Sequence, residues 1–331
     1  MPLSPAAARP LGLAIGVVAD AVLGDPRRYH PVAGFGRAAQ VLERRLHADA
    51  VAPGAVYTAL LVGGPWLLGR AAERATAGRP VLRTAVTAAA TWAVLGGTSL
   101  AREGTVMAGL LDAAEQVAPP ALALAAARAR LSHLCARDPS AMSTADLARA
   151  TVESLAENSS DAAVAPLLWG AAAGVPGLLA YRAANTLDAM VGYTTPRHLR
   201  FGRVVARLDD VLNLVPARVT GLLTVVAAPV VGGSVTSGWR VLRHDGARHP
   251  SPNAGRPEAA TAGVLGVALG GENVYHGRVE RRPVMGVGGR APRADDVRRA
   301  VVLGRAVVAQ GAVLAVAAAA VLGRRAARRG R

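Results

Sequence analysis

The sequence predicts an all-α fold: a polytopic integral membrane helical protein in which polar, partly helical loops form the active site. Of its 331 residues, 52% are hydrophobic and only 3% aromatic, so Ala, Val, Leu and 37 Gly carry the apolar fraction. Closely packed membrane helices favour such small residues. Five charge-free stretches are also long enough to cross a bilayer, since about 20 helical residues span its apolar core. They are 51–69, 84–101, 162–181, 219–239 and 306–323. Five buried helices of a large soluble protein are the alternative.

The segments around these stretches complete a single membrane-embedded domain over 1–331. Residues 11–23 contain Asp20, so we expect a shallow or buried helix there and no signal peptide. The polar segment 102–161 has a helical pattern. The segment 182–218 is too charged for lipid, because each central charge costs about 2.5 to 3.5 kcal/mol. The segment 240–305 is expected to be loop-dominated, apart from a short helix from Glu258 to about Leu269.

The basic segments conflict with a simple five-span topology. Residues 70–83, 182–218 and the tail 324–331 are all positive, and five crossings cannot place all three in the cytoplasm. We therefore expect 162–181 to enter and leave on one side. Five helix-breaking residues support a break in its middle: Pro166, Gly170, Gly174, Pro176 and Gly177.

Composition excludes several chemistries. All 38 basic residues are Arg, so a GK[ST] phosphate loop, a pyridoxal-phosphate Schiff base and a lysyl-adenylate are absent. The single cysteine, Cys135, is expected to be an apolar filler and permits neither an internal disulfide nor a zinc-thiolate site. A net charge of +16 would suit nucleic acid, but scattered Arg and few aromatics do not, so we expect no nucleic-acid partner.

A first polar cluster precedes the stretch 162–181. Glu153, Glu157 and Asp161 are four residues apart and share one helix face. Stacked carboxylates repel one another unless a cation lies among them, so the spacing suggests a hard divalent metal such as Mg²⁺. A solvated acidic face that caps the next helix is the alternative.

A second cluster follows the same stretch, with polar residues spaced three or four apart. Asp supplies oxygen ligands and Arg a bidentate fork, so the cluster suits Mg²⁺ and phosphate. The alternative is an ion pair of Asp209 or Asp210 with Arg207 or Arg218 that anchors the helix end. The cluster comprises Arg182, Asn185, Asp188, Arg207, Asp209, Asp210, Asn213 and Arg218.

A third cluster lies at 248–258, where prolines fix an irregular loop. Asn253 and Glu258 are placed to cap the following helix, and Arg248 and Arg256 beside its N-terminus suggest an anion site. His249 is either a hydrogen-bond partner in the structure or a catalyst.

Together these motifs resemble the CobD/CbiB family of adenosylcobinamide-phosphate synthases, integral membrane proteins of cobalamin biosynthesis. The similarity runs from Leu11 to beyond Met285 in family order. The sequence departs from the family pattern at two places. One is near the second Ser of ENSSD, and the other is Ala254, where the family often has Ser. The motifs are GDP…HPV, ESLAENSSD, YRAANTLDAMVGY, RLDDVLNLVPAR and HPSPNAGRPEA…GVALGGENVY.

The resemblance implies that the free propionate of adenosylcobyric acid condenses with the amine of aminopropanol phosphate, or a related amino-alcohol phosphate, while ATP is consumed. It further implies a multi-pass protein of the cytoplasmic membrane, in contact with the lipid bilayer. Association with other late enzymes of the pathway is an open expectation. A carboxylate needs activation before it forms an amide, so we expect an acyl phosphate.

We hypothesise residue roles on this basis. The Mg²⁺ ligands are Glu153, Glu157, Asp161, Asp209 and Asp210, of which the last four are also catalytic candidates. Glu258 or His249 takes the proton of the attacking amine. ATP and substrate phosphates are held by Arg182, Asn185, Asp188, Arg207, Asn213, Arg218, Arg248, Asn253 and Arg256. The competing function is a membrane transporter or permease for a corrinoid or another anionic solute.

Overall fold

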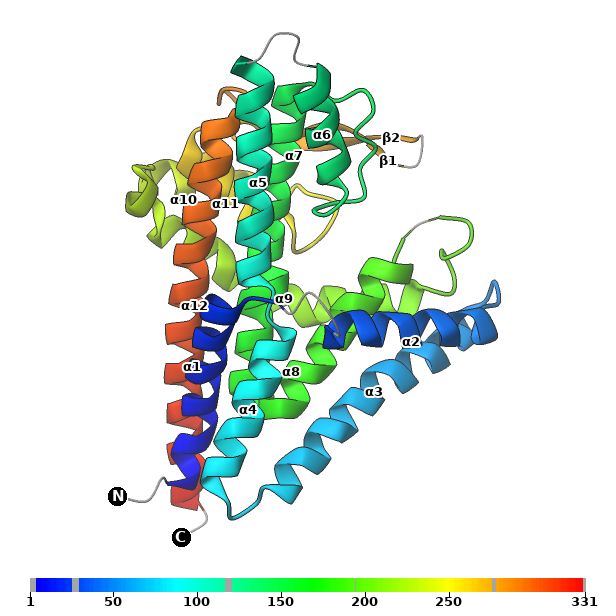
Figure 1. Cartoon of the computed structure of the whole chain (residues 1–331), viewed down its shortest axis with the longest axis vertical. Coiled ribbons are helices and arrows are strands. Elements are labelled where there is room, and N and C mark those ends of the chain that lie inside the picture. The colour runs from blue at the N-terminus through cyan, green and yellow to red at the C-terminus, as the bar shows by residue number, and fades with distance from the viewer. Residues whose placement is uncertain (1–3, 26–29, 117–120, 194, 276–277, 330–331) are drawn as a thin grey trace. The chain divides into compact units, whose positions relative to one another are not determined.

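The computed structural model describes residues 4–25, 30–116, 121–193, 195–275 and 278–329, and Figure 1 shows that they are almost entirely helical. This agrees with the predicted all-α class. The helices are α1 Pro5–Leu23, α2 Pro31–Leu46, α3 Val51–Ala75, α4 Pro80–Val94, α5 Gly97–Gln116, α6 Ala121–Leu131, α7 Thr144–Ser159, α8 Ala165–Val191, α9 Arg203–Val226, α10 Val235–Asp245, α11 Gly255–Leu265 and α12 Ala294–Arg329. Shorter elements are the π-helix Ser160–Val164, the 3₁₀ helix Ala228–Val231, and strands β1 Leu269–Tyr275 and β2 Arg278–Met285.

The chain forms two compact units, each assembled from discontinuous segments. Unit 1 comprises Met1–Gly96, Asp161–Asn213 and Gly311–Arg331, and unit 2 comprises Gly97–Ser160 and Leu214–Gln310. The single membrane-embedded domain over 1–331 stays a prediction of the sequence.

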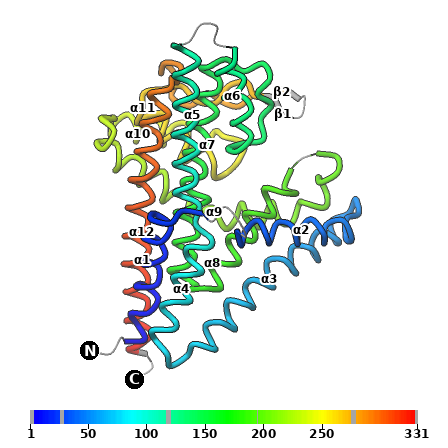
Figure 2. Tube along the Cα trace, viewed as in Figure 1, coloured from blue at the N-terminus to red at the C-terminus, as the bar shows by residue number. Residues whose placement is uncertain are grey.

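Unit 1 is built on close helix packing. In α1, Gly12 lies so near α4 that a Cβ there would be 2.5 Å from Thr87 Cβ, and Gly16 meets Thr91 in the same way. A shared core joins Leu13 of α1 with α4, α8 and the C-terminal half of α12, whose traces are seen in Figure 2. Small residues at the contact are what membrane helices use to approach one another.

The segment 162–181 turns back on itself. Gly174 has φ 71° and ψ −149°, a conformation that only glycine adopts readily, and Pro176 follows it. Consequently the Tyr181 hydroxyl lies 3.1 Å from the Asp161 carbonyl oxygen, whereas a straight helix would separate them by about 30 Å. The predicted break in the middle of this stretch is therefore present in the structure.

Charged side chains satisfy the backbone groups that the break releases. The Val175 N–H donates to Glu73 Oε1 at 3.3 Å, and Arg9 Nη1 donates to the Ala171 carbonyl oxygen at 3.3 Å. A Cβ at Gly174 would collide with Glu73 Oε1. A break at membrane depth requires such partners, because lipid supplies none.

Among the residues that the structure describes, four helical segments are long and apolar enough to cross a membrane: Pro5–Leu23, Val51–Ala75, Thr144–Val191 and Ala294–Arg328. Three of them contain the predicted stretches 51–69, 162–181 and 306–323. The first contains residues 11–23, for which a shallow or buried helix is the prediction, and its Asp20 side chain is buried within the protein.

The other two predicted spans are not continuous helices. The stretch 84–101 is divided at Leu95, which is extended, and the Gly96 N–H donates to the Ala162 carbonyl oxygen instead of continuing α4. The stretch 219–239 is divided by the 3₁₀ turn Ala228–Val231 and by Gly232 in the left-handed region. Absence of charge marked these stretches as apolar but did not reveal their breaks.

Unit 2 contains the polar segments. Ser143 begins α7 with a capping box that includes Asp146. The segment 240–305 is more regular than its expected loop character: α10, α11 and an antiparallel β1–β2 hairpin fill most of it. Charged residues on both faces of the hairpin hide the alternation that identifies a strand. Asn253 also does not cap α11, whose N-cap is Ala254.

Candidate active-site clusters

The turn in α8 gathers a polar group in unit 1 that we call the fold-back cluster: Asp161, Tyr181, Arg182, Asp209 and Asn213. The buried Tyr181 hydroxyl lies 2.8 Å from Asn213 Oδ1. Asn213 Nδ2 in turn donates to Asp209 Oδ2 at 2.9 Å, as the i,i+4 spacing of these two residues on one helix face permits. A buried hydrogen-bonded chain therefore fixes the second half of α8 against α9.

Arg182 is the cation of this cluster. Its guanidinium interacts electrostatically with Asp25 and Asp161, but within the described part of the chain its buried Nε has no hydrogen-bond partner. Arg182 also lines a pocket of about 210 Å³ with mainly apolar walls, including Val94 and Leu179. A buried guanidinium N–H without an acceptor is costly, so an anion in this pocket would be stabilised.

The remaining predicted residues of unit 1 lie nearer its surface. Arg207 is 77% exposed and 3.9 Å from Asp210 Oδ2, so the ion-pair alternative is realised here. Burial raises the pKa of Asp210 despite the opposing effect of Arg207. Asn185 and Asp188 lie further along α8, where the Asp188 carbonyl accepts the N–H of Gly192, the residue that ends the helix.

Unit 2 contains a second group, the buried acid cluster: Glu153, Glu157 and Glu258 with Arg137, Arg149 and Arg282. Glu153 forms an ion pair with Arg137, lies 3.7 Å from Arg149 Nη1 and accepts the Gly270 N–H at 2.6 Å. Its carboxylate is 2% exposed and already neutralised. The cation that the acidic spacing requires is therefore supplied by arginine.

This arrangement does not suit Glu153 as a magnesium ligand. Within the residues that the structure describes, no group of three or more His, Cys, Asp or Glu side chains could hold a metal ion. Of the five predicted ligands, Glu153 and Glu157 belong to unit 2, and Asp161, Asp209 and Asp210 belong to unit 1.

Glu258 is the most perturbed acid outside the apolar helices. It is 1% exposed on α11, and burial together with the negative charges of Glu153 and Glu157 raises its pKa well above the ordinary value. Its Oε1 lacks a hydrogen-bond partner among the described residues. A buried carboxyl with a raised pKa and an oxygen that lacks a partner is a candidate to exchange a proton with a bound group.

His249 accepts a hydrogen bond through its ring in this structure. Burial and the nearby Arg282 cation lower its pKa to about 4, so the ring is neutral at pH 7. Its Nδ1 accepts the Ser251 N–H at 3.0 Å, which leaves the ring proton on Nε2. This tautomer makes Glu258 the better candidate to accept a proton from an amine.

Two arginines in unit 2 form a second anion-binding candidate. Burial and the adjacent Arg218 cation lower the pKa of Arg256, and the buried Nε of Arg256 has no partner in the described segments. Like-charged guanidinium groups repel unless an anion lies with them. The other predicted residues here shape the loop: Arg248 contacts Asp245 at 3.4 Å, and the Asn253 carbonyl accepts the Arg256 N–H.

Several residues of the clusters escaped the sequence-based reasoning. Arg149 precedes Glu153 by four residues, so helical spacing could have identified it. Arg137 and Gly270 reach Glu153 only through tertiary packing and give no local signal. Asn273 of β1 is also buried, accepts from Arg149 at 3.0 Å, and has an Nδ2 without a partner in the described part of the chain.

Comparison with known proteins identifies the chain's relatives. The family model described as CobD/Cbib protein matches residues 13–304. The cobalamin biosynthesis protein CobD of Mycobacterium tuberculosis is 53% identical over 310 residues, covering 93% of this chain and 95% of the relative. The protein of that name from Geobacter metallireducens is 42% identical, covering 82% and 84%, and that from Chromobacterium violaceum is 39% identical, covering 95% and 97%. No solved structure matches the chain.

These matches extend through both units and include every cluster described above. The four apolar helical segments fit a membrane protein, and the relatives' names fit an enzyme role in cobalamin biosynthesis. The chain belongs to the CobD/CbiB protein family.

Proposed function

We propose that the protein is an adenosylcobinamide-phosphate synthase, which joins adenosylcobyric acid to aminopropanol phosphate or a related amino-alcohol phosphate in an ATP-dependent reaction. The observation that carries the proposal is the buried Glu258 carboxyl, whose Oε1 has no partner among the described residues and whose pKa is raised. Family membership supplies the pathway, and this carboxyl supplies a group suited to amide formation.

The reaction has two balanced steps. A propionate oxygen takes the terminal phosphoryl group of ATP, giving an acyl phosphate and ADP. The amine nitrogen then attacks the acyl carbon, the carbon–oxygen bond to phosphate breaks, phosphate leaves, and the nitrogen loses one proton. Because the chain has no lysine, arginine and backbone N–H groups must neutralise the phosphates.

Arg182 in unit 1 is proposed to bind an anionic group that is carried on an aliphatic arm. The pocket that it lines is small and mainly apolar, which suits an aliphatic arm that ends in a carboxylate. The methylene groups would contact Val94 and Leu179, and the carboxylate would accept from the guanidinium. This arrangement would give the buried Nε its missing acceptor.

In unit 2, Arg218 and Arg256 are proposed to bind the phosphate of the amino alcohol, and Glu258 to accept the proton of its amine. A cationic ammonium group near Glu258 favours ionisation of the carboxyl and lowers its pKa. The pKa of the Glu258 carboxyl and that of the substrate ammonium group then lie closer together than before. A smaller difference between the two pKa values favours proton transfer. The His249 N–H is available to hold an oxygen of the substrate.

Magnesium is proposed to enter with ATP. Mg²⁺ commonly uses one or two carboxylates together with substrate phosphates. The ion would therefore not need Glu153. Its protein ligand would be Glu157 in unit 2, or it would be drawn from Asp161, Asp209 and Asp210 in unit 1. The ion would neutralise phosphate charge. We also propose a multi-pass location in the cytoplasmic membrane and association with other late enzymes of the pathway.

The direct test uses the full chain purified in detergent with ATP, Mg²⁺, adenosylcobyric acid and aminopropanol phosphate. We expect adenosylcobinamide phosphate, ADP and phosphate in equal amounts. Glu258→Gln should lower kcat at least about 100-fold, the usual contribution of a general base, whereas Glu115→Gln at an exposed position should not. Corrinoid uptake into vesicles without any ligation would contradict the proposal and favour the transporter.

A further inference from the structure

Two basic segments of unit 1 have no role in the chemistry above. Residues 70–83 contain four arginines against one acid, and the tail 324–331 contains five arginines. Figure 1 shows that the α3–α4 turn, the start of α1 and the end of α12 lie at the same end of unit 1. Because α1, α3 and α12 are candidate membrane spans, this basic end is suited to the boundary where apolar chains meet charged lipid headgroups.

A cavity of about 430 Å³, which we call the basic-end cavity, lies among these helix ends and within unit 1. The charged residues of its lining are Arg9 of α1 and Arg83 of α4. Small or apolar residues of α1, α8 and α12 form its walls, among them Ala172, Leu322 and Ala326. Leu322 is 42% exposed, so the apolar lining continues to the outer surface of α12. The cavity therefore combines two cations with an apolar wall.

The two arginines of this cavity share one carboxylate. Arg9 Nη2 and Arg83 Nη2 lie 3.7 and 3.6 Å from Glu73 Oε1, which also accepts the Val175 N–H at 3.3 Å. The two guanidinium groups repel one another. Two cations and one carboxylate leave one positive charge, which a phosphodiester group with its single negative charge would balance.

Arg83 is better placed than Arg9 to hold such an anion. Arg9 Nη1 already donates to the Ala171 carbonyl oxygen at 3.3 Å and lies 3.5 Å from that of Ala172. The Arg83 side chain forms an ion pair with Glu73 but no hydrogen bond in the described part of the chain. Its guanidinium group would donate two parallel hydrogen bonds to a phosphate group.

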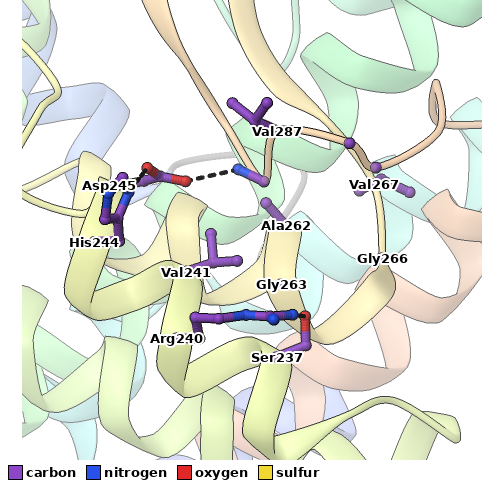
Figure 3. A pocket seen from close by; sticks show the side chains of 13 residues that line it. Ser237, Arg240, Val241, His244, Asp245, Ala262, Gly263, Gly266, Val267 and Val287 are labelled. Carbon is purple, nitrogen blue, oxygen red and sulfur yellow. Dashed lines mark hydrogen bonds and ion pairs between the residues drawn. The ribbon is translucent and has the colours of Figure 1, made fainter.

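A larger cavity in unit 2 lacks these features. Figure 3 shows this cavity of about 610 Å³, which is lined by Arg240 and Asp245. These two charges cancel, and Asp245 Oδ2 accepts the Gly286 N–H at 2.9 Å. Within the described part of the chain, its lining residues lie outside the four candidate membrane spans. Arg240 is therefore an arginine that lines a cavity without an excess of charge or a membrane span beside it.

We propose that the basic-end cavity binds the headgroup of an anionic phospholipid such as phosphatidylglycerol. The phosphodiester accepts hydrogen bonds from Arg83 and Arg9. The acyl chains leave past Leu322 along the surface of α12, where Val321 is 48% exposed. A soluble phosphate ester offers the same anionic chemistry, but it has no acyl chain to cover this apolar surface. The lipid site does not depend on the proposed ligation.

The test measures binding of a phosphatidylglycerol with a fluorescent nitrobenzoxadiazole label to the full chain purified in detergent. The wild type should bind this lipid saturably. Unlabelled phosphatidylglycerol should displace it, whereas phosphatidylcholine and glycerol 3-phosphate should not. Arg83→Gln removes a cation that donates to the phosphate and should weaken binding about tenfold. Glu73→Gln keeps an oxygen for the Val175 N–H but removes the competing negative charge, so it should bind about two- to fivefold more tightly.

A second pair of variants alters the wall of the cavity. Ala326 lines the cavity and is exposed, so substitutions there should leave the fold intact. Ala326→Glu brings a negative charge beside the phosphate and should weaken binding by about two- to fivefold relative to the isosteric Ala326→Gln. Thermal unfolding in detergent establishes that each variant is folded.

Arg74→Gln is the matched control, because Arg74 is exposed in the last turn of α3 but does not line the cavity. Arg240→Gln in unit 2 controls for the loss of an arginine from another cavity. Both variants should bind the labelled lipid as the wild type does.

Three results would overturn the proposal. Wild-type affinity in both Arg83→Gln and Ala326→Glu would show that the lipid does not occupy this cavity. An equal loss of affinity in Arg74→Gln and Arg83→Gln would show that diffuse basic charge attracts the lipid. Displacement of the labelled lipid by glycerol 3-phosphate would show that the cavity takes a soluble phosphate ester in place of a lipid.

Discussion

The fold-back cluster of unit 1 and the buried acid cluster of unit 2 gather polar side chains by different means. In the first, the turn at Gly174 returns the chain, and neutral groups such as Tyr181 and Asn213 carry the hydrogen bonds. In the second, Glu153 is buried among two arginines and a backbone N–H of the hairpin. Unit 1 thus depends on backbone shape, and unit 2 on charge neutralisation.

The largest expected effect is in unit 2. Glu153→Gln leaves Arg137 buried without its carboxylate, and breaking such a pair costs about 3 to 5 kcal/mol. We expect that loss in the free energy of unfolding, measured by denaturant titration in detergent. Glu272→Gln is the control, because the Glu272–Arg281 pair is 57% and 86% exposed and contributes about 0 to 1 kcal/mol. Equal losses of stability in the two variants would show that burial of the Glu153–Arg137 ion pair does not make it more important than an exposed pair.

Acid should also affect unit 2 through His249. Its folded pKa of about 4 is below the ordinary 6.5, so the unfolded chain binds more protons between these values. Stability is therefore present above pH 6.5 and is lost as the pH falls towards 4, by about 3 kcal/mol. His249→Asn retains an acceptor for the Ser251 N–H and should flatten this part of the unfolding profile. An unchanged profile would contradict the buried neutral ring.

In unit 1 the sensitive position is Gly174. Alanine there must adopt a positive φ and meets Glu73 Oε1, so Gly174→Ala should cost about 1 to 3 kcal/mol. Gly64 is the control: it lies within α3 with nothing near its missing Cβ, and Gly64→Ala should stabilise the helix by about 0.5 to 1 kcal/mol. Thermal unfolding measures both changes. If Gly174→Ala left the stability unchanged, the turn would not require the positive φ that glycine adopts.

The smallest effect is expected within the fold-back cluster. Tyr181→Phe removes the hydroxyl beside Asn213 Oδ1 and should cost about 1 to 2 kcal/mol. A double-mutant cycle with Asn213→Ala measures the coupling, because the two losses should not add if the residues share one bond. Full additivity would show that this contact stabilises neither helix end.

The contrast between the units also explains what the sequence could predict. The placement of proline and glycine predicted the turn in 162–181, because that turn arises from local backbone geometry. The ion pair of Glu153 with Arg137 was missed, since those residues meet only after the loop before α7 packs. The hairpin was missed because charges on both faces obscure its alternation. Stretches 84–101 and 219–239 were wrong as single helices, since tertiary contacts and a 3₁₀ turn divide them.

The central claim is that the apolar segment reverses at Gly174, so that its two ends face one side of the membrane. The direct measurement is labelling of Ser140→Cys and Arg200→Cys by a membrane-impermeant maleimide, each in a Cys135→Ala background, in right-side-out and inverted vesicles. Both native positions are exposed. The account predicts that the two cysteines react from the same face. Reaction from opposite faces would show that 162–181 crosses the bilayer and would contradict it.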